Sequence, residues 1–322
     1  MDNNTSDMTT LVQGWNSGPN TRGTMDIIWS SLLTIVLCTW TALCLNLPHP
    51  NDGSFEILRQ RAKWIFWAIV APELVLTVAM GQYASARRSV LRFRKFTAQQ
   101  DSWTLRHGFY ADMGGMLLQP RASTPFLVNA RQLAYLVEKG YVEVPQITAG
   151  EIWDRSKTDA LGRLLSLLQA TWFLIELLGR AFLQLPTTTL ELSTGAIVVC
   201  TMGTFLCWFH KPSDVQTGII LKTEATRADI LIDAGDAAAV PYKHTPLDFI
   251  AKQSPTCGFE VMEFFNLRFD NRERPLRRFP NDRFPDIGTM EKFLPFCTTT
   301  TFASLHLIGW NFEFPSQTEK VL

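Results

Sequence analysis

The feature that most constrains this chain is a run of 21 residues, 27–47, that contains no Asp, Glu, Lys, Arg or His. A helix needs about 20 predominantly apolar residues to cross the ~30 Å hydrocarbon core of a bilayer. A secretory signal has a basic first segment and a shorter apolar stretch, whereas Arg22 is the only basic residue before this run. The run therefore predicts a retained membrane helix.

Four further apolar stretches have the length of membrane helices, and each carries at most two Asp, Glu, Lys or Arg residues. They are 64–83, 164–185, 192–209 and 293–310. The last could instead be a buried or interfacial segment, because its threonine run at 298–301 is only weakly apolar. The pattern predicts an all-α membrane protein, a polytopic helical bundle of four to five transmembrane helices with two polar loop regions.

These stretches divide the chain into six parts. They are an N-terminal tail (1–24), the first two membrane helices (25–83), a polar loop with short helices (84–163), the next two membrane helices (164–210), a second polar loop (211–292), and a candidate fifth helix with the C-terminal tail (293–322). Within the first loop, 130–139 reads as a short helix stopped by Gly140. Thr148 and Glu151 form a capping box that should start a helix running on into the third span.

The charges predict an orientation rather than a polar partner. Thirty Lys and Arg balance thirty Asp and Glu, so net charge does not steer the chain toward nucleic acid. Within about 20 residues of the spans, sixteen basic residues lie on one side and five on the other, which favours a cytoplasmic N-terminus and cytoplasmic polar loops. Arg59, Arg61 and Lys63 disagree, because they fall on the other side.

Orientation also decides whether two formal N-glycan acceptors are used. Asn3 and Asn4 each begin an Asn-x-Ser/Thr triplet. They would be silent with a cytoplasmic N-terminus and available with a lumenal one.

The sequence contains no motif of a soluble enzyme or metal protein. The six cysteines form no Cys-x-x-Cys pair, and no Cys/His spacing matches a zinc site. No nucleotide-binding loop, nucleophile elbow or HExxH motif is present. We therefore predict no cofactor and no metal.

Two acids inside predicted spans are the candidates for chemistry. An acid near the bilayer centre must face protein or water. Glu176 has Arg180 at i+4, so the pair could neutralise itself and hold helix packing; we expect both, with Gln169, to face other helices. Glu73 follows Pro72, where a kink could hydrate the site. A structural role at the kink is as plausible as a role as proton donor.

Several segments together resemble a large fungal family of integral membrane proteins of unassigned function. They are RGT at 22–24, CTWT at 38–41, LNLP at 45–48, APEL at 71–74, HGFYADMGG at 107–115, DRSK at 154–157, QATWF at 169–173, LPTT at 185–188, LE at 190–191, KPSDV at 211–215 and WNFEFP at 310–315. The resemblance implies a multi-pass membrane protein, and some members lie beside secondary-metabolite genes. Family members continue past the last block into further helices, so we expect this chain to be shortened at its C-terminus.

Two functional hypotheses follow. The first is an accessory or scaffold component of a fungal secondary-metabolite pathway, located in a membrane whose identity the sequence does not give. The alternative is a membrane-embedded enzyme, of cyclase or isomerase type, that would use Glu73 or Glu176 as proton donor on a lipid-like substrate. The expected partners are the lipid bilayer and a lipid-like small molecule, with no nucleic acid and no indicated oligomeric state.

Overall fold

The computed structural model describes residues 23–96, 103–157, 160–251, 253–255, 274–285 and 289–308. The helices are α1 (Thr24–Ala42), α2 (Ser54–Val70), α3 (Pro72–Phe93), α4 (Leu105–Tyr110), α5 (Ala130–Glu138), α6 (Ala149–Asp154), α7 (Ala160–Phe182), α8 (Thr189–Cys207), α9 (Arg227–Ala234) and α11 (Thr289–Ile308). The strands are β1 (Met116–Gln119), β2 (Phe126–Leu127), β3 (Ile219–Lys222), β4 (Gln253–Pro255) and β5 (Arg283–Pro285).

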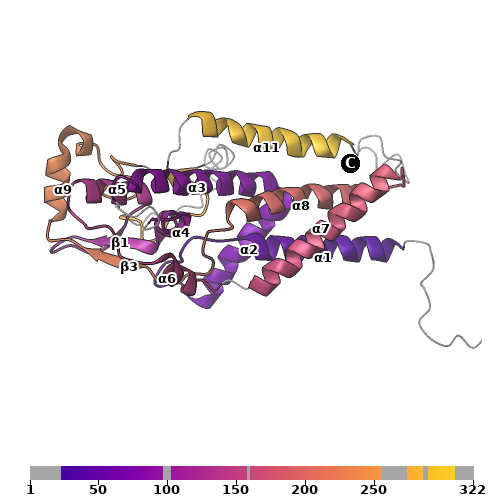
Figure 1. The fold of residues 1–322 in the computed structure, drawn as a ribbon, viewed down its shortest axis with the longest axis horizontal. Coiled ribbons are helices and arrows are strands. Elements are labelled where there is room, and N and C mark those ends of the chain that lie inside the picture. The colour runs from indigo at the N-terminus through magenta and orange to yellow at the C-terminus, as the bar shows by residue number, and fades with distance from the viewer. Residues whose placement is uncertain are drawn as a thin grey trace, which may run out of the picture.

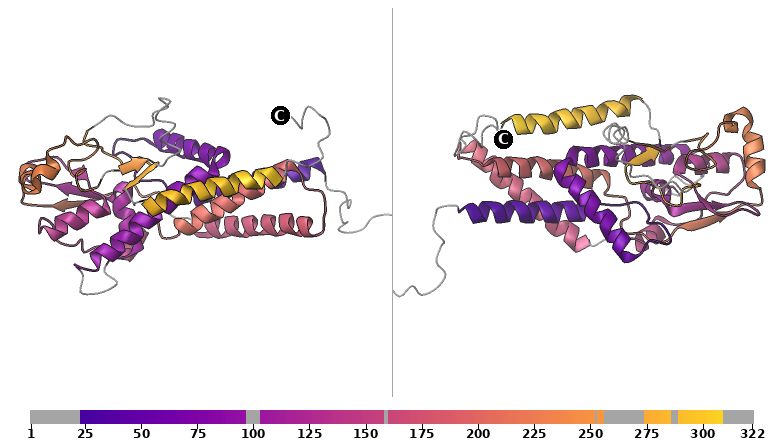
Figure 2. Two further views of the ribbon diagram at one scale, coloured as in Figure 1. Left: turned by 90° about the horizontal axis from the view of Figure 1, so that it is seen from above. Right: turned by 180° about the vertical axis from the view of Figure 1, so that it is seen from behind.

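The molecule is elongated and has two ends of different character (Figure 1). At one end α1, α7 and α8 pack together with α11 alongside, and we call this part the bundle. At the other end the short helices and a small sheet form what we call the head (Figure 2). α3 joins the two, because it contacts α8 and α11 as well as α4 and α5.

Three helices are long and apolar enough to cross a membrane: α1, residues 161–182 of α7, and α8. They confirm helices at the first, third and fourth predicted spans. α11 covers most of the fifth predicted span and is not one of the three. Its threonine run lowers its mean hydropathy, which is the reason that this stretch was ambiguous in the sequence.

The second predicted span is broken rather than continuous. α2 ends at Val70, and α3 begins at Pro72 after a bend of 112°. Proline has no N–H and clashes with the carbonyl four residues earlier, so it is tolerated in a first helical turn and not inside a helix. If the bent pair counts as one span, the described residues contain four candidates instead of three.

The outward surface of the bundle is strongly apolar. Only 17% of the most apolar window of α7 is buried, against 50% for α8. The large apolar side chains that α7 exposes are Leu161, Leu164, Leu165, Leu168, Trp172, Ile175, Leu178 and Phe182. An exposed apolar surface of this kind is characteristic of contact with lipid or another protein.

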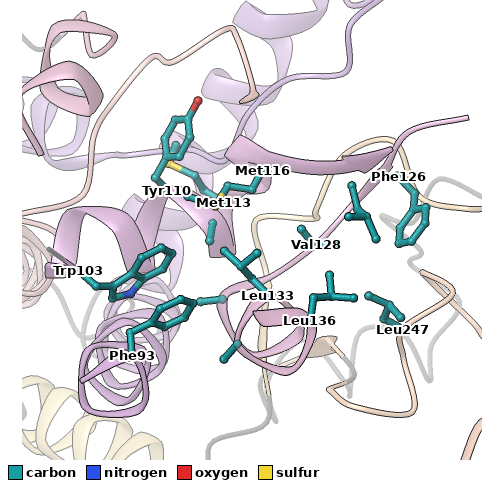
Figure 3. Packing of buried hydrophobic residues seen from close by; sticks show 14 of the residues in the cluster. Phe93, Trp103, Tyr110, Met113, Met116, Phe126, Val128, Leu133, Leu136 and Leu247 are labelled. Carbon is teal, nitrogen blue, oxygen red and sulfur yellow. The ribbon is translucent and has the colours of Figure 1, made fainter. Parts of the chain in front are cut away.

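The head has its own hydrophobic core, built between α3, α5 and the sheet (Figure 3). The rings of Phe93 and Trp103 stack with their centroids 3.7 Å apart. Around them lie Leu133 and Leu136 of α5 and Met116 of β1, each fully buried. The head is therefore a packed domain-like unit rather than a pair of loops.

A small sheet corrects the expectation of an all-α fold. Three strands have the order β2-β1-β3, in which β1 is antiparallel to β2 and parallel to β3. β4 and β5 form a separate antiparallel pair. The strands have two to four residues each, which is too short to give a recognisable alternating pattern in the sequence.

The two short helices that the sequence predicts in the first polar region are present, but their ends differ from the prediction. α5 ends at Glu138, one residue before the predicted helix end at 139, and Gly140 has the positive φ of 74° that favours glycine there. The Thr148 hydroxyl accepts from the Glu151 amide at 3.1 Å, as a capping box requires. However, α6 ends at Asp154, so it does not continue into α7.

The stacked ring of Phe93 gives a test of the head core. We expect Phe93→Ala to lower the free energy of unfolding by about 3–5 kcal/mol, the usual cost of deleting a buried aromatic ring. Denaturant titration of the detergent-purified protein would measure it. Phe66→Ala is the matched control, because Phe66 is 57% exposed on α2; equal losses in the two variants would contradict the assignment of Phe93 to a core.

Candidate functional site

Glu73 lies at the bend between α2 and α3. It occupies the first turn of α3 and is half-buried. Its backbone carbonyl accepts from the Thr77 hydroxyl at 2.8 Å, and that hydroxyl also lies 3.3 Å from the hydroxyl of Thr298 on α11. The first turn of α3, which carries Glu73, thus directly follows α2 and lies beside α11.

Glu176 does not lie where the sequence predicted. It is exposed on α7, and the Arg180 guanidinium donates to the carbonyl of Pro186. Gln169 does face inward, because its amide donates to Thr34 of α1 at 3.0 Å. α7 crosses the bundle obliquely (Figure 1). Gln169 reaches α1, whereas Glu176, two turns later on α7, is exposed.

The most deeply buried charged side chain among the described residues is Lys211, which is 1% exposed. It follows α8, after a turn in which its amide donates to the Trp208 carbonyl at 2.9 Å. Its ammonium Nζ donates to Asn46 Oδ1 at 3.0 Å and to Gln82 Oε1 at 2.8 Å. The Nζ also lies 4.7 Å from the centre of the Trp208 ring, within the range of a cation–π contact.

Burial controls the electrostatics around Lys211. Loss of water lowers the pKa of Lys211 to about 7, and the nearby carboxylate of Asp112 opposes that shift. Burial likewise raises the pKa of Asp112 to about 6. Hydrogen bonds from Ser85 (2.6 Å) and from the Ala130 amide (2.9 Å) favour the Asp112 anion. Burial thus moves the pKa values of both Asp112 and Lys211 toward neutral pH.

The 107–115 motif supplies the support for Asp112. Both His107 ring nitrogens are in hydrogen-bonding contact, Nδ1 with Thr104 and Nε2 with the Ile147 carbonyl at 2.8 Å. Gly108 allows α4 to approach α3, because a Cβ there would lie 2.9 Å from the backbone of Ala86. Gly114 takes a φ of 93°, which ends the π-helical turn 111–115 and starts β1. These motif residues therefore have structural roles.

The partners of Lys211 also build the wall of a cavity. The Asn46 side-chain amide donates to the Pro280 carbonyl at 3.0 Å, and its backbone amide donates to the Asn281 side chain. Gln82 donates to the Asn281 carbonyl at 3.4 Å. One Asn and one Gln thus connect the buried ammonium group to residues 279–281.

The cavity lies between α2, the α1–α2 connection and residues 276–282, and its volume is about 90 Å³. This volume can hold several water molecules or a small polar group. Its charged lining residues are Asp52, Arg61, Lys63, Asp214, Arg278 and Asp282. Two ion pairs lie within this lining: Arg61 with Asp214 at 3.0 Å, and Arg278 with Asp52 at 3.0 Å.

Neither predicted catalytic acid lines this cavity. Within the described part of the chain, no group of three or more His, Cys, Asp or Glu residues could hold a metal ion. The sequence did not identify Asn46, Gln82, Asp112 or Lys211 as candidate site residues, although all but Gln82 lie in segments that carry the family resemblance. The available signal was polar residues at the ends of apolar stretches, above all a lysine that follows the fourth span after only His210.

Comparison with protein families finds one match. The model of a family of unknown function, DUF8562, matches residues 2–233. The chain belongs to this family. Comparisons with curated proteins and with solved structures found no significant match. The matched residues include Asn46, Gln82 and Lys211, whereas the cavity wall at 276–282 lies outside the match.

The depressed pKa of Lys211 predicts a pH dependence of stability. The unfolded chain keeps the ordinary lysine pKa of 10.5, so between pH 7 and 10 it binds more protons than the folded chain. The destabilising contribution is complete below pH 7 and is relieved as pH rises above it. We expect the free energy of unfolding to rise from pH 7 to 9 in the unaltered protein and to rise less in Lys211→Met.

Denaturant titrations at the two pH values would measure this difference. Lys139→Met is the matched control, since the Lys139 side chain is 44% exposed and pairs with Asp233 on the surface of the head. An unchanged pH slope in Lys211→Met would contradict the assignment.

Proposed function

We propose that this protein is an integral membrane protein that binds the polar end of an amphiphilic small molecule in the cavity beside α2. Binding without chemistry is the role of an accessory or carrier component. The resemblance to fungal proteins near secondary-metabolite genes supports a place in such a pathway. The bilayer is then the first partner, and the amphiphile is the second.

The observation that carries this proposal is the reversed polarity of α2. Its outward side exposes Phe55, Leu58, Phe66, Ile69 and Val70, and Arg59 is exposed among them in the first half of the helix. With the exposed Ala62 they recur at the three- and four-residue spacing of one helix face. Its opposite side lines the cavity with the polar side chains of Gln60, Arg61 and Lys63 beside the apolar surface of Ile57, Trp64 and Trp67. A helix with its apolar face outward and its polar face inward is suited to lipid outside and a polar ligand inside.

The charges of the cavity favour a neutral or zwitterionic group. Its lining has three basic and three acidic side chains, and two ion pairs already join four of them. A bare anion or cation would meet no excess of opposite charge. Trp64 and Trp67 add aromatic surface to the lining, of the kind found at membrane interfaces, where one end of a ligand is apolar and the other is wet.

An enzyme acting on a lipid-like substrate is the alternative. Its proton donor would be Glu73 or Glu176, as the sequence predicts, and its substrate would then bind outside this cavity, because neither acid lines it. The binding role needs no such group and is the function that we favour.

Filling the cavity tests the proposal. We expect Gln60→Trp to place an indole in the cavity and to reduce the amphiphile that co-purifies with the full-length protein in mild detergent. The expected loss is at least about tenfold, which corresponds to ~1.4 kcal/mol of binding free energy. Mass spectrometry of an organic extract, normalised to protein, measures it.

Ala62→Trp is the matched control. Ala62 lies on the exposed side of α2, so the same bulky residue there should leave the co-purified amphiphile unchanged. Equal amounts of amphiphile in Gln60→Trp and in the unaltered protein would refute binding in this cavity.

A further inference from the structure

The head-side ends of the three candidate membrane helices are joined to one another. Just after α1, Cys44 Sγ accepts from Arg163 in the first turns of α7 at 3.0 Å. Just before α7, the Lys157 amide donates to the carbonyl of Ser213, after α8, at 3.1 Å. The chain therefore leaves α1 and enters α7 at the same end of the bundle.

The two arms of the bent pair return to this same end. On α2, Arg61 pairs with Asp214 at 3.0 Å. On α3, Gln82 accepts from Lys211 at 2.8 Å. Residues 211 and 214 are close in sequence, so Arg61 on α2 and Gln82 on α3 lie at a similar depth along the bundle.

The bend itself lies deeper in the bundle. Val70 is nine residues beyond Arg61, which is about 13 Å along a helix. Pro72 borders the same small space as Thr39 of α1 and Thr201 of α8, and Thr201 is inside the apolar part of α8. Near this depth α2 exposes Phe66, Ile69 and Val70. α2 thus runs from the head-side end of the bundle into its apolar part. After the bend, α3 runs back to the same end.

We propose that α2 and α3 form a re-entrant hairpin, so that the N-terminal tail, with its glycan acceptors Asn3 and Asn4, lies on the opposite side of the membrane from the head. This inference rests on the membrane insertion that the proposed function includes. It replaces the sequence-based orientation, which counted the bent pair as a full crossing and thereby placed the tail and the head on one side.

The basic residues identify the cytoplasmic side. Within about 20 residues of α1, α7 and α8, or in their end turns, the head side holds Arg59, Arg61, Arg155, Lys157, Arg163, Lys211, Lys222 and Arg227. The opposite side holds Arg22 and Arg180. The head is then cytoplasmic and the tail lumenal, and Arg59 and Arg61, which disagreed with the earlier orientation, now agree.

Glycan mapping tests the arrangement. The full-length chain is translated into sealed vesicles of endoplasmic reticulum, and alkaline extraction first shows whether it is integrated. We expect one glycan, removed by endoglycosidase and absent from an Asn3→Gln/Asn4→Gln variant, since these two residues begin the only acceptor triplets in the sequence. Protease added outside the vesicles should cleave the head and leave the N-terminal tail protected.

A control acceptor reports the other side. In the Asn3→Gln/Asn4→Gln background, Ala237→Asn with Ala239→Thr creates a triplet at exposed head positions, and we expect no glycan on it. A glycan there, or a tail that protease removes together with the head, would overturn the re-entrant hairpin. Loss of the chain on alkaline extraction would instead refute membrane insertion, and with it the proposed function.

Discussion

Burying the ammonium group of Lys211 is the constraint on which the rest of the structure depends. A buried cation is costly unless oxygen atoms replace its water shell. The two amide oxygens that do so come from Asn46, after α1, and from Gln82, in the middle of α3. The same ammonium group therefore fixes the ends of α1 and α8 against α3, and through Asn281 it also fixes the wall of the cavity.

The sequence predicts the parts of this fold that depend on composition. α1 and α8 follow from their uncharged length, and the caps of α5 and α6 follow from local hydrogen-bonding residues. The site does not follow, because Asn46 and Gln82 are 165 and 129 residues from Lys211. The exposure of Glu176 depends on the oblique crossing of α7, and no periodicity within one helix encodes a crossing angle.

α2 and α7 show two ways in which a helix can meet an apolar environment. α7 is apolar on its outward face and packs small or polar groups such as Ser166 and Ala170 inward. α2 carries Arg61 inward, where Asp214 from the segment after α8 pairs with it. Across the same cavity, Arg278 pairs with Asp52 of the α1–α2 connection. Mean hydropathy identifies α7 as a candidate membrane helix by itself and α2 only together with α3, but it does not show that α2 borders a polar cavity. The cavity is thus located by the direction in which the polar face of a helix points, and not by the mean hydropathy of that helix.

The parallel pairing of β1 with β3 sets an order of assembly. The strands align Met116 with Ile219 and Gln119 with Lys222, and the chain between them contains both α7 and α8. To complete the head sheet, the chain must therefore return to the head after passing through α7 and α8. Such long-range pairing is slow compared with local helix formation, so completion of the head reports that the chain has returned through α7 and α8.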